Sequence, residues 1–167
     1  MPSVCEEKIF TGIFREYSET LYHYLFYKTG DAGLSQDLVQ EAFTRLWQNC
    51  ASVLFHSAKG YVFKTANNLL LNEYSHQKVV LKFRQKPTRQ HTHENPEYIM
   101  EEKELKQQLE AAIAALPEKQ RIVFLLSRID KKTYKEIAEI LGISKQAVEK
   151  RMYNALNELR KVSAKLR

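Results

Sequence analysis

The side chains best suited to binding another molecule lie near the C-terminal end of the 167-residue chain. Thr133 is followed three residues later by Glu136, the spacing of a capping box at the start of a helix. Gly142 supplies a turn, and Ser144 is placed to cap a second helix. Apolar residues at helical spacing form the buried stripe of that second helix, at Val148, Met152, Leu156 and Leu159. The pattern predicts a helix-turn-helix.

The N-terminal half of this second helix should face outward with side chains that can read DNA. In the major groove, Lys and Arg donate to guanine, Gln pairs with adenine and Glu accepts from cytosine. The residues expected to contact DNA are Ser144, Lys145, Gln146, Glu149, Lys150 and Arg151. Tyr153 and Asn154 could either join this face or border the core. A helical hairpin with a merely solvated charged face is disfavoured, because the caps, the glycine and the apolar stripe all coincide.

Helical periodicity also runs through the rest of the chain. Apolar residues recur at three-and-four spacing over residues 10–25, in a helix that Gly30 should end. A second helix should begin after Ser35 as its N-cap and end near Cys50. Further helical patterns cover residues 62–76, 105–116 and 117–126. Strand-like alternation is absent, so we expect an all-α fold.

Charge is unevenly distributed among three segments. Residues 1–77 carry 6 basic and 8 acidic side chains (−2), residues 78–96 carry 5 and 1 (+4), and residues 97–167 carry 15 and 11 (+4), which accounts for the formal net charge of +6. Apolar periodicity decays within 78–96. We therefore expect two small helical domains, 1–77 and 97–167, joined by a basic linker. Residues 145–167 alone hold seven basic and two acidic side chains, a local charge of +5 on the predicted second helix of the motif.

Other classes of protein find no support in the sequence. No apolar run approaches the roughly 18 to 20 residues of a membrane-spanning helix, and the first residues lack a secretory signal, so we expect a cytoplasmic protein without membrane insertion. The five glycines form no phosphate-binding loop. No motif places a serine, a histidine and an acid together. We therefore expect neither a cofactor nor an enzyme.

The cysteines and histidines are expected to be structurally ordinary. Cys5 and Cys50 are far apart and belong to no close-spaced pair, so we expect two reduced thiols rather than a disulfide or a zinc site. His91 and His93 lie in the predicted linker with only Glu94 as a nearby carboxylate. A solvated linker is favoured there over a metal site.

Three segments resemble a known family. Residues 116–126 (Leu-Pro-Glu-Lys-Gln-Arg-Ile-Val-Phe-Leu-Leu), which precede the helix-turn-helix, look like the fourth domain of bacterial sigma factors of the sigma-70 family. Residues 37–49 resemble the helix with which the second sigma domain binds the clamp of RNA polymerase, and residues 60–74 resemble the helix that faces the minus-ten promoter element. With only these two domains, the chain resembles the extracytoplasmic-function group.

The resemblance implies a surface for core RNA polymerase on the second helix. The residues assigned to it are Asp37, Gln40, Glu41, Arg45 and Trp47. A partly exposed tryptophan beside charged groups suits a protein interface. The residues alone favour the alternative that Phe43 and Trp47 both belong to the core. With the resemblance, Phe43 is assigned to the core and Trp47 to the interface.

The resemblance also implies a minus-ten site, although the third helix departs from the family pattern. Where the family often has Trp, Arg and Asp, this chain has Tyr61, Asn67 and Asn72. Aromatic and amide side chains can still bind unstacked bases, and lysines can bind phosphates. The residues assigned to this site are Phe55, His56, Lys59, Lys64, Asn67, Asn68, Asn72 and Tyr74. Phe55 and His56 are the candidates for stacking on a flipped base.

The function implied is promoter-specific initiation of transcription without covalent chemistry. The expected partners are core RNA polymerase, promoter DNA at the minus-ten and minus-thirty-five elements, and an anti-sigma factor, which in many members of the group is membrane-anchored. The main alternative is a helix-turn-helix transcriptional regulator with an N-terminal sensing or dimerisation domain. A purely structural helical adaptor would leave the basic second helix of the motif without a role.

Overall fold

The computed structural model describes residues 1–73 and 96–165, and all regular structure in those residues is helical. The predicted all-α fold is therefore confirmed. The helices, in chain order, are α1 (Glu7–Thr29), α2 (Ala32–Gln48), the short 3-10 helix η1 (Phe55–Ser57), α3 (Ala58–Glu73), α4 (Pro96–Ala115), α5 (Glu118–Arg128), α6 (Tyr134–Leu141) and α7 (Lys145–Lys165).

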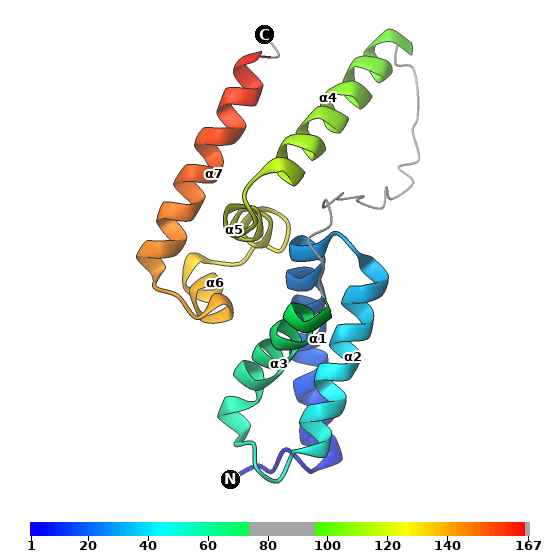
Figure 1. Cartoon of the computed structure of the whole chain (residues 1–167), viewed down its shortest axis with the longest axis vertical. Coiled ribbons are helices and arrows are strands. Elements are labelled where there is room, and N and C mark those ends of the chain that lie inside the picture. Colours follow the sequence, from blue (N-terminus) through cyan, green and yellow to red (C-terminus); the bar gives the residue numbers. More distant parts are fainter. Residues whose placement is uncertain (74–95, 166–167) are drawn as a thin grey trace.

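The first three helices form an N-terminal bundle, in which α1 and α2 run antiparallel and α3 packs on both (Figure 1). α1 ends as predicted at Gly30, which adopts a left-handed conformation with φ of 70° that a side chain would disfavour. The start of α2 was predicted wrongly. Asp31 is its N-cap and accepts from the Leu34 N–H at 2.9 Å, whereas Ser35 is buried inside the helix and donates to the Asp31 carbonyl at 2.6 Å.

The remaining helices, α4 to α7, form a C-terminal group around α5. α5 packs against α6 and α7 and also against the end of α1, while α4 and the C-terminal end of α7 both extend toward the top of the view in Figure 1. Buried apolar side chains from α1 to α3 and from α4 to α7 belong to one continuous cluster. The two helical groups are therefore packed against each other in this structure.

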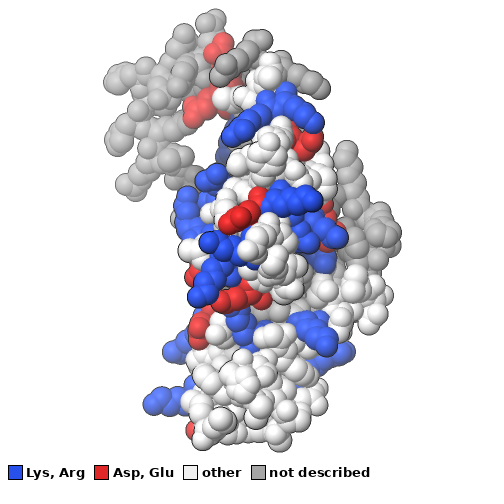
Figure 2. All heavy atoms as spheres, turned by 90° about the vertical axis from the view of Figure 1, so that its left-hand side faces the viewer, with Lys and Arg blue, Asp and Glu red and all other residues white. Residues whose placement is uncertain are grey.

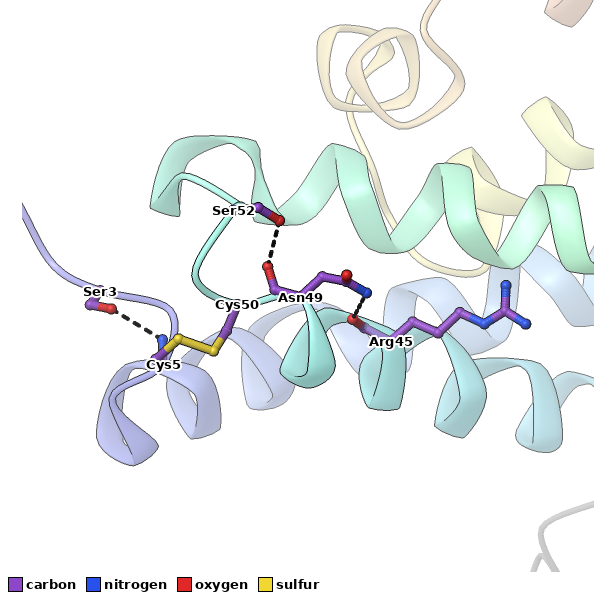
Figure 3. The surroundings of a disulfide bond; sticks show 6 residues. All are labelled: Ser3, Cys5, Arg45, Asn49, Cys50 and Ser52. Atoms are coloured by element: carbon purple, nitrogen blue, oxygen red, sulfur yellow. Dashed lines mark hydrogen bonds between the residues drawn. A yellow bond between two sulfur atoms is a disulfide. The ribbon is translucent and has the colours of Figure 1, made fainter.

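The expectation of two reduced cysteines was wrong. Cys5 and Cys50 form a disulfide, with their Cα atoms 5.0 Å apart although they are separated by 45 residues in sequence (Figure 3). The reason is the antiparallel pairing of α1 and α2, which brings the residues before the start of α1 beside those after the end of α2. The spacing of the two cysteines in the sequence does not reveal that they are close in space.

Some of the expectations concern residues that the structure does not describe, and others concern metal sites and membrane-spanning helices. Residues 78–95 of the predicted linker, with His91 and His93, and also Tyr74 lie outside residues 1–73 and 96–165, whereas Pro96, expected as the last linker residue, begins α4. Within the described part of the chain, no group of three or more His, Cys, Asp or Glu side chains could hold a metal ion. None of the helices in those same residues is both long and apolar enough to cross a bilayer.

Candidate nucleic-acid and protein interfaces

Local hydrogen bonds hold the turn that carries the predicted recognition helix. The Glu136 N–H donates to Thr133 Oγ1 (3.2 Å) and the Thr133 N–H donates to Glu136 Oε2 (2.7 Å), so the predicted capping box is present. The bond from the Thr133 N–H lowers the pKa of the Glu136 carboxyl, because it stabilises the charged form. Gly142 ends α6 with φ of 65°, and Ser144 Oγ accepts from the Ala147 N–H at 3.1 Å to cap α7.

α7 has one packed face and one exposed face, as a recognition helix requires. Val148 and Met152 are buried against the C-terminal group, and Leu156 and Leu159 are half-buried. Of the side chains expected to contact DNA, only Arg151 is half-buried. The others are exposed: Ser144, Lys145, Gln146, Glu149 and Lys150. Figure 2, which views the molecule from the α7 side, shows many Lys and Arg on this face among fewer acids, while the lowest part of the view is mainly uncharged.

Tyr153 extends the exposed face of α7 by one turn. It is 64% exposed and follows Glu149 by four residues and Lys150 by three, which places the three side chains on one side of the helix. The sequence left open whether Tyr153 borders the core. Its exposure now makes it a candidate DNA contact beside the predicted residues.

The surface of α2 assigned to a protein partner is exposed in the structure. Asp37, Gln40, Glu41 and Arg45 are all exposed, and Arg45 Nε donates to Glu41 Oε1 at 2.9 Å. Trp47 is 45% exposed, whereas Phe43 is 3% exposed. Phe43 therefore lies in the core, and the Trp47 side chain is open to solvent.

Two aromatic residues of α1 join this surface, and the sequence reasoning missed them. The Phe10 ring lies 5.0 Å from the Trp47 ring and the Phe14 ring lies 4.9 Å from the Phe43 ring, both edge to face. Phe14 is 40% exposed. Together with α2 they line an open groove formed by Glu7, Phe10, Phe14, Gln40, Phe43, Thr44 and Trp47. We name this the α1–α2 groove. The sequence reasoning missed them because Phe10 and Phe14 follow the apolar spacing of α1, which predicts a buried helix face.

The residues assigned to the minus-ten element divide into two sets. Lys59, Lys64 and Asn67 line a cavity of about 280 Å³ between α3 and the C-terminal end of α6. The rest of the described set lies outside that cavity and is exposed: Phe55, His56, Asn68 and Asn72.

Two members of the first set, Lys59 and Asn67, contact other side chains of the protein. Lys59 Nζ lies 3.8 Å from Glu139 Oε2 of α6, and it sits 5.6 Å from the centre of the Tyr17 ring. Asn67 Oδ1 accepts from Lys28 Nζ at 2.6 Å and from the Tyr24 hydroxyl at 3.4 Å. Of these contacts, the one with Glu139 comes from the C-terminal group and the others come from α1, while residues 139–142 line the cavity opposite α3.

A buried arginine joins the two helical groups. Arg121 of α5 is 4% exposed. Its Nε donates to the Tyr27 carbonyl (2.8 Å) and its Nη2 to the Lys28 carbonyl (3.2 Å), both in the last turn of α1. Its Nη1 donates to the Ala114 and Leu116 carbonyls, each at 3.2 Å. The last carbonyls of a helix have no partner within the helix, so a cation there satisfies them and complements the helix dipole.

Asp130, just after α5, forms a second connection to α1. Its Oδ1 lies 2.6 Å from His23 Nδ1 and accepts from the Tyr27 hydroxyl at 3.1 Å. The hydrogen bond to Asp130 raises the pKa of His23 despite the opposing effect of burial. Burial, together with Asp130, raises the pKa of the Tyr27 hydroxyl, which stays protonated. Lys28 and Glu118 add an ion pair at 3.4 Å across the same contact.

The folded chain is thus an all-helical protein with a capped helix-turn-helix and an exposed basic recognition helix, which is the architecture of a DNA-binding transcription factor. Two family models match its two halves. "Sigma-70 region 2" matches residues 13–79, and "Sigma-70, region 4" matches residues 106–159.

Curated relatives agree with these matches. RNA polymerase sigma factor YlaC of Bacillus subtilis is 27% identical over 160 residues, which cover 93% of this chain and 92% of that protein. ECF RNA polymerase sigma factor SigE of Mycolicibacterium smegmatis is 24% identical over 157 residues, covering 90% of this chain and 60% of that protein. Among solved structures, the sigma factor RpoE in complex with the anti-sigma factor NepR from Bartonella quintana has a similar fold, with a TM-score of 0.57, 15% identity and coverage of 93% of this chain and 96% of that one.

The chain belongs to the extracytoplasmic-function group of the sigma-70 family of RNA polymerase sigma factors. As a sigma factor it works with core RNA polymerase to direct transcription initiation, region 4 binds promoter DNA, and it is not an enzyme. The alternative of a regulator with a sensing or dimerisation domain is set aside, because residues 13–79 match a sigma region.

Proposed function

We propose that the two helical groups divide the work of promoter recognition. Residues 1–77 act as the second sigma domain, residues 97–167 act as the fourth, and residues 78–96 join them. The match of region 2 to the first group and of region 4 to the second supports this division. In this assignment the chain acts in the cytoplasm, where RNA polymerase works.

The minus-thirty-five element is bound by the exposed face of α7, through Ser144, Lys145, Gln146, Glu149, Lys150 and Arg151. The observation that carries the proposed function is this face, which follows the capped turn at Gly142 and holds donors and acceptors that can pair with base edges. Tyr153 adds an aromatic contact to DNA at the end of the same face.

The minus-ten element is bound by Phe55, His56, Lys59, Lys64, Asn67, Asn68, Asn72 and Tyr74. Phe55 is 46% exposed and His56 is exposed, which suits stacking on an unpaired base. Lys59 and Asn67 bind groups of α6 and α1 in the observed arrangement. Binding of a phosphate by Lys59 would therefore require its ion pair with Glu139 of α6 to break, whereas the partners of Asn67 lie in α1.

Core polymerase is bound by Asp37, Gln40, Glu41, Arg45 and Trp47, extended by the α1–α2 groove. The groove supplies the combination that protein interfaces use, a partly exposed aromatic cluster with charged groups at its rim. An anti-sigma factor is a further partner, as NepR is for the similar structure of RpoE.

The experiment that tests the polymerase surface compares two adjacent positions of α2. Trp47→Ala removes the exposed aromatic side chain, and Gln48→Ala is the matched control because Gln48 is also exposed but does not line the groove. Loss of a central aromatic contact typically costs about 2 kcal/mol or more, or about 30-fold in affinity. We expect Trp47→Ala alone to weaken binding to purified core polymerase while binding to promoter duplex is unchanged. Equal affinities of the two variants would reject this surface.

A further inference from the structure

The Cys5–Cys50 disulfide lies at the surface of the N-terminal bundle. Cys5 is exposed and Cys50 is half-buried, so a small thiol can reach the bond (Figure 3). The chain has two cysteines, so the pairing within one molecule is unambiguous.

The disulfide connects two segments at one end of the N-terminal bundle. On one side is the segment before α1, where Val4 is buried and Ser3 forms an isolated antiparallel bridge with Leu54. On the other side is the loop after α2, which turns through hydrogen bonds from the Ser52 N–H to the Asn49 carbonyl (3.0 Å) and from the Ser57 N–H to the Leu54 carbonyl (2.9 Å). Beyond these turns the loop is largely exposed.

This loop leads directly into η1, which carries Phe55 and His56. Leu54 and Phe55 are 57% and 46% exposed, so side-chain burial contributes little to fixing their position. The disulfide and the Ser3–Leu54 bridge attach the loop to the start of α1. Reduction of the disulfide would leave the bridge, the buried Val4 and the half-buried Val53 as attachments.

The location of the protein decides how this bond behaves. In the reducing cytoplasm, stable disulfides are rare, and those that form are usually transient and respond to the redox state. The exposed position of Cys5 permits the exchange that such behaviour requires.

We propose that Cys5 and Cys50 form a reversible thiol–disulfide site that couples the redox state of the cytoplasm to the loop presenting Phe55 and His56. The proposal rests on the proposed function, in which this loop contacts the minus-ten strand. The oxidised protein holds the loop in the observed position, and the reduced protein releases it.

The chemistry requires a small disulfide such as oxidised glutathione as the oxidant. The Cys5 thiolate attacks one sulfur of that disulfide, forms a mixed disulfide and releases one small thiol. The Cys50 thiolate then attacks the Cys5 sulfur, which forms the Cys5–Cys50 bond and releases the second small thiol. Two protein thiols are oxidised and one small disulfide is reduced to two thiols. Excess reduced glutathione reverses both steps.

Reduction of the disulfide should affect only the residues near it. α1 has 23 residues, so its two ends lie about 34 Å apart at 1.5 Å per residue. The disulfide is next to the start of α1, whereas α5 contacts its end through Tyr27 and Lys28. Reduction should therefore loosen the loop over residues 49–57 and leave α5 and the helix-turn-helix unchanged.

The test uses the full chain in glutathione buffers that range from fully reduced to fully oxidised. Free thiols are counted by maleimide labelling, and amide hydrogen exchange is followed in the peptide covering residues 49–57 and in α5. We expect the disulfide to form and break within this range, with faster exchange in residues 49–57 of the reduced protein and equal exchange in α5. A disulfide that survives excess reduced glutathione, or equal exchange of residues 49–57 in both forms, would overturn the proposal.

A double variant links this site to transcription. Cys5→Ser with Cys50→Ser mimics the reduced state without exposing the polymerase to an oxidant, and unchanged exchange in α5 shows that it is folded. With core polymerase and genomic templates, we expect the double variant to initiate about fivefold less than the oxidised protein, the low end of what one stacked base contributes. Equal initiation by the two would reject the coupling. Absence of specific initiation by either would instead count against the proposed function, and the thiol and exchange measurements would still judge the redox site.

Discussion

His23 Nδ1 and Asp130 Oδ1 lie 2.6 Å apart although 107 residues separate them, and this contact fastens α1 to the segment after α5. It stands beside the Arg121 hydrogen bonds to the last carbonyls of α1. Because the same packing places Glu139 of α6 beside Lys59 of α3 and sets α6 across the cavity that Asn67 lines, its strength should influence how readily these two minus-ten residues become accessible.

The His23–Asp130 contact should weaken as pH rises. Asp130 raises the pKa of His23 above its ordinary value of 6.5, with a supporting charge from Glu19 and an opposing one from Lys132. Because the pKa of His23 is raised in the packed arrangement, protonated His23 stabilises that arrangement. This stabilisation is fully present below pH 6.5 and is lost as the pH rises through the raised pKa. Small-angle X-ray scattering should therefore show a larger radius of gyration above that pKa than below it.

Asp130→Asn supplies the control for this pH effect. The amide cannot stabilise protonated His23 as a carboxylate does, so the radius of gyration of the variant should depend less on pH than that of the natural protein. The same pH dependence in both proteins would show that His23 is not the responsible group.

Arg121 should be a principal stabilising residue of the packed arrangement. Arg121→Met keeps an unbranched apolar side chain but removes the donors to four carbonyls, two of them at the end of α1. Leaving buried carbonyls without a partner costs about 1 to 3 kcal/mol each, so we expect the free energy of unfolding to fall by at least about 2 kcal/mol. Arg128→Met in the same helix is the matched control, because Arg128 is exposed. Equal losses for the two variants in urea unfolding would contradict this role.

The recognition helix should lose promoter affinity when Lys150 is truncated. If Lys150 reads a base edge, Lys150→Ala should cost roughly 1 to 3 kcal/mol of binding free energy, with core binding unchanged. Lys161→Ala is a suitable control. Lys161 is also exposed on α7, but it lies near the C-terminal end of the helix and pairs with Glu158 at 2.9 Å. Binding of promoter duplex must be measured at one stated salt concentration, because phosphate contacts make affinity salt-dependent. A similar loss for both variants would indicate general electrostatic attraction rather than base recognition.

Local signals made the helix-turn-helix predictable. Thr133, Gly142 and Ser144 act within a few residues of their partners, so their roles follow from sequence spacing. The same reasoning failed at the start of α2, because Asp31 and Ser35 can both cap a helix and only packing shows that Ser35 is buried.

Contacts between distant segments could not be predicted in this way. The disulfide of Cys5 depends on the antiparallel pairing of α1 and α2. The contact of Arg121 with α1 depends on how the two helical groups pack, and no local pattern marks it. Phe10 and Phe14 follow the apolar period of a buried helix face, so their share in the α1–α2 groove became visible only with α2 in place.

Promoter-specific initiation is tested by transcription with purified core RNA polymerase on a library of genomic fragments from the source organism. With this protein added, we expect transcripts that begin at defined sites, and we expect Lys150→Ala to reduce them while Lys161→Ala does not. Core polymerase alone is the control. If addition of this protein produces no new transcript with a defined start site, the chain does not act as a promoter-specificity factor.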